Sequence, residues 1–308
     1  MKKLILFTII LIFIPFFIVK IYGLDTVSEI ELNYISNILV RVKRVDTGNI
    51  DVIPLEEYIV GVLAGEMPVY FDIEALKAQA VASRSYVLKR IEYNIDNDYD
   101  VVDSVLNQVY LDREYLKEAW KDDYVVNINK LTEAVNATSG EYLSYNDEII
   151  DAMFFSTSNG YTEDSNNVFN LSLPYLKSVE SHWDSETSTA FHSSKKILLS
   201  KFYELLGLNY NKKLNYEVVE KSDTNRNIKL SINGTEISAR DMYNKLGLKS
   251  TDFYMVQDGE YVIIYMTGYG HGVGMSQYGA LGMALDGYSY EEILNYYYNG
   301  TLIKKIKN

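Results

Sequence analysis

The chain has 308 residues, 47% of them hydrophobic, and a net charge of −13 at neutral pH. This length and apolar content exclude a disordered chain and allow one large domain or two small ones with a substantial core. The absence of cysteine excludes disulfides and thiol chemistry, and three scattered histidines cannot build a Cys/His zinc site. The acidic balance argues against nucleic acid as a partner, because phosphate binding requires basic patches. We therefore expect no metal and no cofactor, and a neutral glycan suits this chain better than a polyanion.

Residues 1–24 predict a membrane anchor. An uncharged apolar run covers 4–19 and has lysines on both sides. With the amine of Lys20 extended toward the headgroups, the span reaches Leu24, about the 20 residues that cross a bilayer. A cleaved signal peptide is the alternative, but residues 20–23 make a poor cleavage site. The two N-terminal lysines place the remaining chain, after a linker over 25–37, outside the cytoplasm.

The next hundred residues predict two strands followed by helices. Apolar and basic residues alternate over Ile38–Arg44, and a second strand covers Ile50–Ile53. Pro54 begins a helix that Pro68 stops near Glu66, and Asp72 caps a longer one that ends near Ile91. The apolar stripe of that longer helix contains one arginine among Ile73, Leu76, Ala80, Arg84, Val87 and Ile91. Further helices are expected at about Arg113–Trp120 and Ile128–Ala137.

The rest of the chain predicts hairpins and short helices. Hairpins are expected at Glu141–Phe155, turning at Asn146-Asp147, and at 228–237, turning at Asn233-Gly234. A helix over 238–247, a strand over Glu260–Thr267 and helices over Gln277–Leu285 and Tyr290–Tyr298 follow. The polar stretch 185–225 is expected to be an insertion or a small subdomain. Strands and helices mix without a βαβ rhythm, which indicates an α+β fold.

A glycine-rich stretch, GYGHGVGMSQYGA at 268–280, is the most informative motif. Alternate glycines fit a backbone that needs positive φ or the close approach of another group. Two more motifs precede it, LEEYIVGVLAGEMP at 55–68 and FFSTSNGYTED at 154–164. In this order the three resemble the stage II sporulation protein D family, which includes cell-wall lytic transglycosylases and amidase enhancers. The resemblance implies one domain over 38–304 whose strands and helices form a glycan-binding cleft.

Glu66 is the candidate catalytic residue. The C-terminal end of its helix carries partial negative charge, and apolar residues follow it in sequence. Both effects favour the neutral carboxylic acid and raise its pKa, which a general acid near neutral pH requires. A solvated glutamate at a helix end is the alternative. The resemblance implies the catalytic role, since family members use the glutamate of this Gly-Glu-Met-Pro motif as the acid.

Further residues are expected to bind substrate or to support Glu66. Arg84 must find a carboxylate or leave a buried charge unpaired, and the resemblance implies that it orients Glu66 or holds the glycan. The supporting set, all implied by the motifs, is Arg84, Tyr175, Lys177, Asp184, His271, Ser276 and Gln277. The alternatives are a solvated strand face for Tyr175 and Lys177 and a turn-stabilising role for His271. We expect these side chains to converge with Glu66 on one groove.

The resemblance implies a membrane-anchored, extracytoplasmic lytic transglycosylase that acts on peptidoglycan during endospore formation and engulfment. Glu66 would work alone, with Asp184 as the only competitor for a second carboxylate role. A cell-wall amidase and a membrane protein are the implied partners. A non-enzymatic, wall-binding amidase enhancer is the alternative, and a pure adhesion module leaves the polar cluster around His271 unexplained. Some relatives carry zinc ligands near 154–159, but this chain has no cysteine there.

Overall fold

The computed structural model describes residues 28–307, and its first lobe uses both ends of this range. The earlier part contains β1 (Leu39–Lys43), β2 (Ile50–Pro54), α2 (Leu55–Glu66), α3 (Ile73–Tyr93), β3 (Val101–Val102), α4 (Arg113–Trp120), η1 (Lys121–Asp123), α5 (Tyr124–Ala137), β4 (Glu141–Tyr145), β5 (Glu148–Ile149), β6 (Phe154–Phe155), α6 (Ser165–Phe169) and α7 (Asp184–Thr187). The later part contains β13 (Met275–Ser276), α10 (Gln277–Leu285), α11 (Tyr290–Tyr297) and β14 (Leu302–Lys305).

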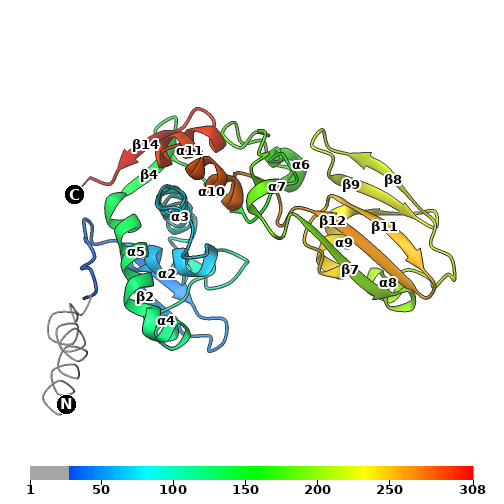
Figure 1. Ribbon diagram of the computed structural model, residues 1–308, viewed down its shortest axis with the longest axis horizontal. Helices are drawn as coiled ribbons and strands as arrows, with labels where there is room; N and C mark the ends of the chain where they lie inside the picture. The colour runs from blue at the N-terminus through cyan, green and yellow to red at the C-terminus, as the bar shows by residue number, and fades with distance from the viewer. Residues whose placement is uncertain (1–27, 308) are drawn as a thin grey trace, which may run out of the picture.

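A second lobe is inserted between α7 and β13. It contains β7 (His192–Leu198), α8 (Leu199–Leu206), β8 (Tyr216–Lys221), β9 (Asn227–Ile232), β10 (Thr235–Ser238), α9 (Ala239–Leu246), β11 (Phe253–Asp258) and β12 (Tyr261–Thr267). Its own hydrophobic core runs from Ile197 to Met266. The inserted unit therefore extends well beyond the stretch 185–225 that the sequence singles out. Figure 1 shows the two lobes side by side along the longest axis.

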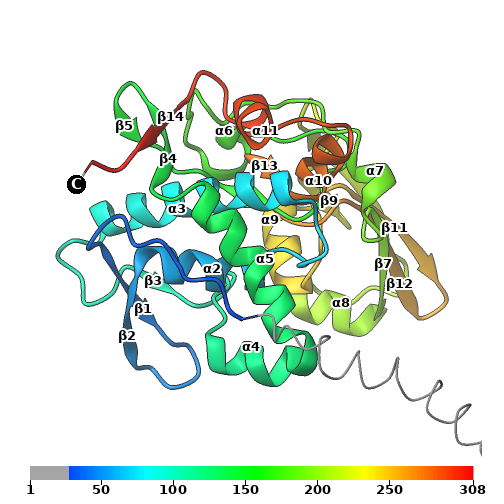
Figure 2. The ribbon, with the colours of Figure 1, turned by 60° about the vertical axis from the view of Figure 1, so that its left-hand side comes forward.

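Helix α3 is the centre of the first lobe, and α2, α5, α10, α11 and β4 pack around it. Figure 2 shows this helix crossing the lobe beneath α11 and beside α5. Asp72 caps the helix by accepting a hydrogen bond from the Glu74 N–H, as expected. Burial is not confined to the predicted stripe, because residues 78–88 are all buried. Small alanines on several faces allow this many neighbours to approach one helix.

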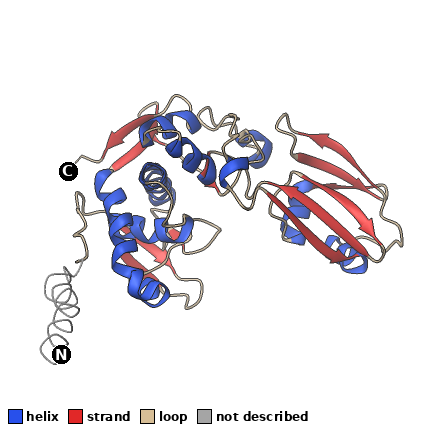
Figure 3. Ribbon diagram, in the orientation of Figure 1, coloured by secondary structure: helices blue, strands red, loops and turns tan. Residues whose placement is uncertain are grey.

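The sheets are small and are interspersed with helices along the described chain, which confirms the α+β class (Figure 3). The strand orders are β2-β1-β3, β14-β4-β5 and β13-β6 in the first lobe, and β10-β9-β8 and β11-β12-β7 in the second. Both predicted hairpin turns are confirmed. Asn146 and Asp147 have φ of 49° and 68°, and Asn233 and Gly234 have φ of 50° and 86°, which is the pattern of a type I′ turn.

An extended segment over 28–38 leads into β1 and runs along α5. Asn129 accepts from the Ile30 N–H and donates to the Ser28 carbonyl, both at 2.8 Å. Asn136, two turns later on the same face, accepts from the Asn33 N–H and donates to the Glu31 carbonyl. The predicted anchor lies outside the described residues. Between residues 28 and 307, no helix is both long and apolar enough to span a bilayer.

Candidate functional site

Glu66 is the last residue of α2, and its carboxyl is largely enclosed. One oxygen, Oε1, accepts a hydrogen bond from the Val109 N–H at 2.6 Å. Gly65 permits this contact, because a Cβ there would lie 2.6 Å from the Val109 carbonyl oxygen. Burial raises the pKa of Glu66, while the Val109 N–H and the Gln277 side-chain amide oppose the rise. The expected upward direction of the shift is thus confirmed, with desolvation as its main cause.

Gln277 is the residue that meets Glu66 from the far end of the chain. It is the first residue of α10 and only 5% exposed. Its amide faces the Glu66 carboxyl closely enough to affect the pKa, yet its Nε2 makes no hydrogen bond of ordinary geometry. Gln277 is therefore a buried amide donor beside the candidate acid, where it favours the ionised carboxylate.

Asp184 holds the start of α10 in place. Its buried carboxylate accepts from the Ser158 N–H at 2.7 Å, from the Ser181 hydroxyl at 2.6 Å, and from the Ser276 hydroxyl. Ser276 is the N-cap of α10. Burial raises the pKa of Asp184, and these serine hydrogen bonds oppose the rise. The carboxylate thus serves as an anchor rather than the free second carboxylate that its position in the motif suggests.

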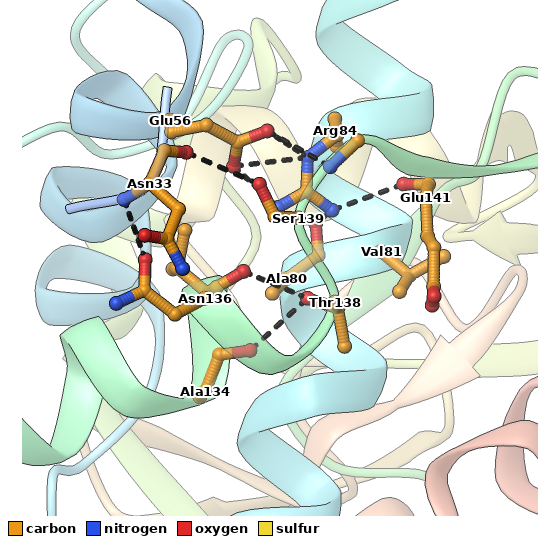
Figure 4. Close-up of polar contacts among 12 residues, drawn as sticks. Asn33, Glu56, Ala80, Val81, Arg84, Ala134, Asn136, Thr138, Ser139 and Glu141 are labelled. Atoms are coloured by element: carbon orange, nitrogen blue, oxygen red, sulfur yellow. Dashed lines mark hydrogen bonds and ion pairs between the residues drawn. The ribbon is translucent and has the colours of Figure 1, made fainter. Parts of the chain in front are cut away.

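Arg84 has no hydrogen bond to Glu66 in the described part of the chain, so its orienting role stays a prediction without a direct contact behind it. The guanidinium is fully buried and donates to both Glu56 oxygens, at 2.6 Å at the closest, and to the Glu141 carbonyl at 3.0 Å (Figure 4). Glu56 lies ten residues before Glu66 on α2, which is about 15 Å along the helix axis. The long-range partner that a buried arginine needs is therefore Glu56, and the fully buried guanidinium is not exposed to a glycan.

Tyr175 and Lys177 lie on a segment without strand structure, contrary to the expected extended strand. The buried Tyr175 hydroxyl accepts from the Asp151 N–H at 3.3 Å, and burial raises the pKa of Tyr175 to about 12. Lys177 pairs with Asp164 at 2.8 Å and is half exposed. Neither side chain has a hydrogen bond to Glu66, and their contact with a glycan stays a prediction.

His271 lies in the glycine-rich loop and is satisfied locally. Its Nδ1 accepts from the Val273 N–H at 3.0 Å, and its ring packs against Phe155 and Phe169. Burial, followed by the nearby Arg226 charge, lowers the pKa of His271 to about 4, while a hydrogen bond with the Phe154 backbone opposes this. The ring is therefore neutral at pH 7, which agrees with the turn-stabilising alternative.

Contacts thus join Glu66, Gln277, Ser276 and Asp184 into one chain, and Arg84 belongs to a separate cluster. Val109, whose N–H holds Glu66, carries no sequence signal, since any residue except proline offers that group. Two surface hollows of about 440 and 620 Å³ lie elsewhere. One is among residues 211–234 and the other between the 34–38 segment and Ile306. The predicted glycan-binding cleft is not among them.

Known proteins similar in sequence to this chain include members of one family. The family described as "Stage II sporulation protein" matches residues 43–145. Stage II sporulation protein D of Bacillus subtilis is 38% identical over 275 residues, covering 88% of this chain and 80% of the relative, and that of Bacillus amyloliquefaciens is 39% identical over the same shares. A Bacillus subtilis protein named amidase enhancer is 30% identical over 79% of this chain and 40% of its own length. The chain therefore belongs to the stage II sporulation protein D family.

Proposed function

We propose that this sporulation protein is a peptidoglycan lytic transglycosylase with Glu66 as its catalytic acid. The observation that carries the proposal is the enclosed Glu66 carboxyl, whose pKa is raised by burial while one oxygen is held by the Val109 N–H. A raised pKa increases the fraction of the carboxyl that carries the proton needed by a leaving-group oxygen.

The proposed reaction uses one carboxyl group twice. Glu66 protonates the glycosidic oxygen between N-acetylmuramic acid and N-acetylglucosamine, and the bond from C1 of the muramic acid to that oxygen breaks. Positive charge develops at C1 and the ring oxygen, assisted by the acetamido group of the same sugar. The Glu66 carboxylate then takes the proton of the C6 hydroxyl, whose oxygen bonds to C1. The product is a 1,6-anhydro end, and no water is consumed.

A single-carboxyl mechanism agrees with the state of the nearest candidate for a second role. The Asp184 carboxylate accepts three hydrogen bonds from serines and is fully buried. A hydrolase with two carboxylates needs the second one free to attack C1 or to activate water. Asp184 has neither freedom, so this arrangement favours the anhydro product over a reducing end.

The proposal includes a place of action. The N-terminal apolar run would anchor the chain in the membrane with both lobes on the extracytoplasmic side, where peptidoglycan lies. We place the protein at the septal or engulfing membrane during endospore formation. Its partners there would be an amidase that removes stem peptides and a membrane protein of the engulfment machinery.

The test is to incubate the whole chain, in detergent, with glycan strands freed of stem peptides and to weigh the products. We expect anhydro ends without the added mass of water. Glu66→Gln keeps the shape of the side chain but delivers no proton, so cleavage should fall by about 10²- to 10⁴-fold. Ordinary reducing ends, or a Glu66→Gln variant that cleaves at nearly the wild-type rate, would refute the mechanism.

A second function is favoured by one comparison, the relative named amidase enhancer. In that case the chain would bind the wall and stimulate an amidase without cleaving glycan. The same preparation separates the two proposals when a cell-wall amidase is added to intact sacculi. Stimulation of the amidase by both wild type and Glu66→Gln, with no glycan cleavage by either, would favour the enhancer.

A further inference from the structure

Two apolar side chains project from the loop that follows β3. Val105 and Leu106 are 87% and 80% exposed. They occupy the two central positions of a tight turn, which the Asn107 N–H closes by donating to the Ser104 carbonyl at 3.0 Å. Exposed turns mostly use Gly, Pro, Asn, Asp or Ser, so an apolar pair at these positions indicates a surface that covers it.

Side-chain hydrogen bonds hold this turn in place. Asn107 accepts from the Val102 N–H at 2.9 Å and donates to the Tyr86 hydroxyl at 3.0 Å, which ties the turn to β3 and α3. The Asp103 carboxylate accepts from the Val45 N–H at 2.8 Å, so the turn between β1 and β2 lies beside it. Val45 is itself 58% exposed. Together with the apolar pair it forms a projecting edge, which we name the apolar tip.

A chain of ion pairs joins the apolar tip to the place where the described chain begins. Arg44 of the β1–β2 turn pairs with Asp103 at 3.1 Å and with Asp112, the N-cap of α4, at 2.7 Å. Arg113, the first residue of α4, pairs with Glu29 at 2.7 Å. Figure 2 shows the β1–β2 turn and α4 together at the lower end of the first lobe. The apolar tip and Glu29 therefore belong to one end of the lobe.

The predicted anchor ends close to this part of the lobe. Residues 28–33 are hydrogen-bonded to two asparagines of α5, so residues 25–27 alone separate the lobe from the apolar segment that ends at Leu24. The four steps from Leu24 to Ser28 span at most about 14 Å. The headgroup layer is itself about 5–8 Å thick. An anchored chain therefore holds this end of the lobe at the bilayer surface.

We propose that the apolar tip inserts into the extracytoplasmic leaflet of the membrane and fixes the first lobe on it. The tip side chains leave water at the boundary between headgroups and acyl chains, about 5–10 Å deep, as the apolar faces of interfacial helices do. This inference rests on the anchor that the proposed function includes, and it does not depend on glycan cleavage.

The charges around the apolar tip favour apolar insertion over attraction to anionic lipid. Two basic residues, Lys43 and Arg44, stand against four acidic ones, which are Asp46, Asp51, Asp103 and Asp112. Arg44 is shared by three of these carboxylates, all within 3.8 Å. Proteins that depend on anionic headgroups present clusters of lysine and arginine instead. The contact should therefore form on neutral phosphatidylcholine, without anionic lipid.

The same loop connects the apolar tip to the candidate acid. Val109, whose N–H holds Glu66, comes three residues after Leu106, at most about 11 Å of chain away. An inserted tip therefore sets the height of Glu66 above the bilayer and directs it toward glycan next to the membrane.

The test uses the absence of cysteine, which allows one dye to be placed at a chosen position. Val45→Cys and Val105→Cys, each labelled with an environment-sensitive NBD dye, are reconstituted as whole chains into phosphatidylcholine vesicles. Both dyes should emit at shorter wavelength and be quenched by a nitroxide on the upper acyl chain. The matched control is Leu171→Cys, because Leu171 is 52% exposed in the same lobe and follows α6, far from α4 in Figures 1 and 2. Its dye should keep an aqueous spectrum.

A second experiment removes the native apolar pair, so that insertion driven by the dye itself is recognised. Val105→Ser and Leu106→Ser are combined in the chain labelled at Val45→Cys, and serine suits an exposed turn. The ratio of inserted to free tip should fall by about 10- to 100-fold, since each apolar side chain contributes about 3- to 10-fold.

Flotation of the vesicles separates the apolar tip from the anchor. A chain that floats while both tip dyes stay aqueous would overturn the tip and retain the anchor. Quenching that survives the serine pair, that is equally strong at Leu171, or that requires anionic lipid would also overturn the tip. A chain that neither floats nor changes its dye spectra would overturn both. Quenching at the tip on vesicles where no glycan is cleaved would retain the tip and refute the transglycosylase.

Discussion

Arg84→Met should unfold the first lobe more easily while leaving the site around Glu66 intact. The change removes three hydrogen bonds from the guanidinium to Glu56 and one to the Glu141 carbonyl. Glu56, 2% exposed, then keeps a single donor, the Gly140 N–H at 3.0 Å. Removing one partner of a buried ion pair leaves an uncompensated charge and typically costs about 3–5 kcal/mol.

The pair itself should contribute much less than the single substitution suggests. Arg84→Met combined with Glu56→Gln removes both charges, and the glutamine oxygen still accepts from the Gly140 N–H. Replacing both partners of a buried pair is often close to neutral. The double variant should therefore regain most of the stability that Arg84→Met loses. An exposed pair in the same lobe, broken by Lys304→Met, is the matched control and should change stability far less.

Denaturant unfolding followed by tryptophan fluorescence suits this test. The two tryptophans, Trp120 and Trp183, both pack in the first lobe, so the signal reports on the lobe that contains Arg84. A midpoint unchanged by Arg84→Met would refute the structural role. An Arg84→Met variant that is as stable as wild type but no longer binds glycan would instead support the site role that the sequence motif predicts for Arg84.

Four further outcomes are expected. Burial raises the pKa of Glu66, so the stabilising contribution of its neutral form is present below its unfolded pKa and is lost as pH rises through the folded pKa. Glu66→Gln should therefore be more stable than wild type at pH 7–8, and this difference in stability should shrink in acid. An equal difference in stability at both pH values contradicts this. Gly279→Ala would place a Cβ 2.1 Å from the Tyr297 hydroxyl and 2.4 Å from that of Ser181; overpacking should cost about 1–3 kcal/mol in denaturant unfolding, and an unchanged midpoint would show that α10 is not held there. Elemental analysis should find no stoichiometric zinc, and one zinc per chain would disprove the prediction. The chain should sediment with membranes at its full mass, whereas a soluble product that starts after Lys20 would show a cleaved signal.

Local signals in the sequence predicted most of the elements correctly. The Asp72 cap and the paired positive-φ turns each depend on residues within four positions of one another. Such interactions form in nearly any context, so their sequence patterns carry over to the fold. Helix α5 begins at Tyr124, earlier than expected, because its first turn continues from η1 rather than from a recognisable cap.

Long-range pairing explains what the sequence left undetermined. Arg84 lies on an apolar stripe, which correctly indicates a buried charge, but Glu56 is 28 residues away and reads as an ordinary acidic residue of a first helical turn. The second core was likewise underestimated. The sequence predicts the hairpin at 228–237 and the strand over Glu260–Thr267 as separate elements and misses β11. Only the shared core with α8 and α9 shows that these strands belong to one unit.

The glycine-rich loop acts on the site through the chain that follows it. A Cβ at Gly274 would lie 1.9 Å from the Met153 carbonyl oxygen, and one at Gly272 would lie 2.8 Å from the Arg226 guanidinium. The groups that approach these glycines closely are therefore other parts of the protein and not a ligand. It joins the second lobe to β6 and sets the backbone of β13 against Phe154. Ser276 and Gln277 come next, one held by Asp184 and the other facing Glu66. On this geometry, substitutions at the glycines should act on Glu66 through the position of α10, since His271 is already satisfied by Val273 and Phe154.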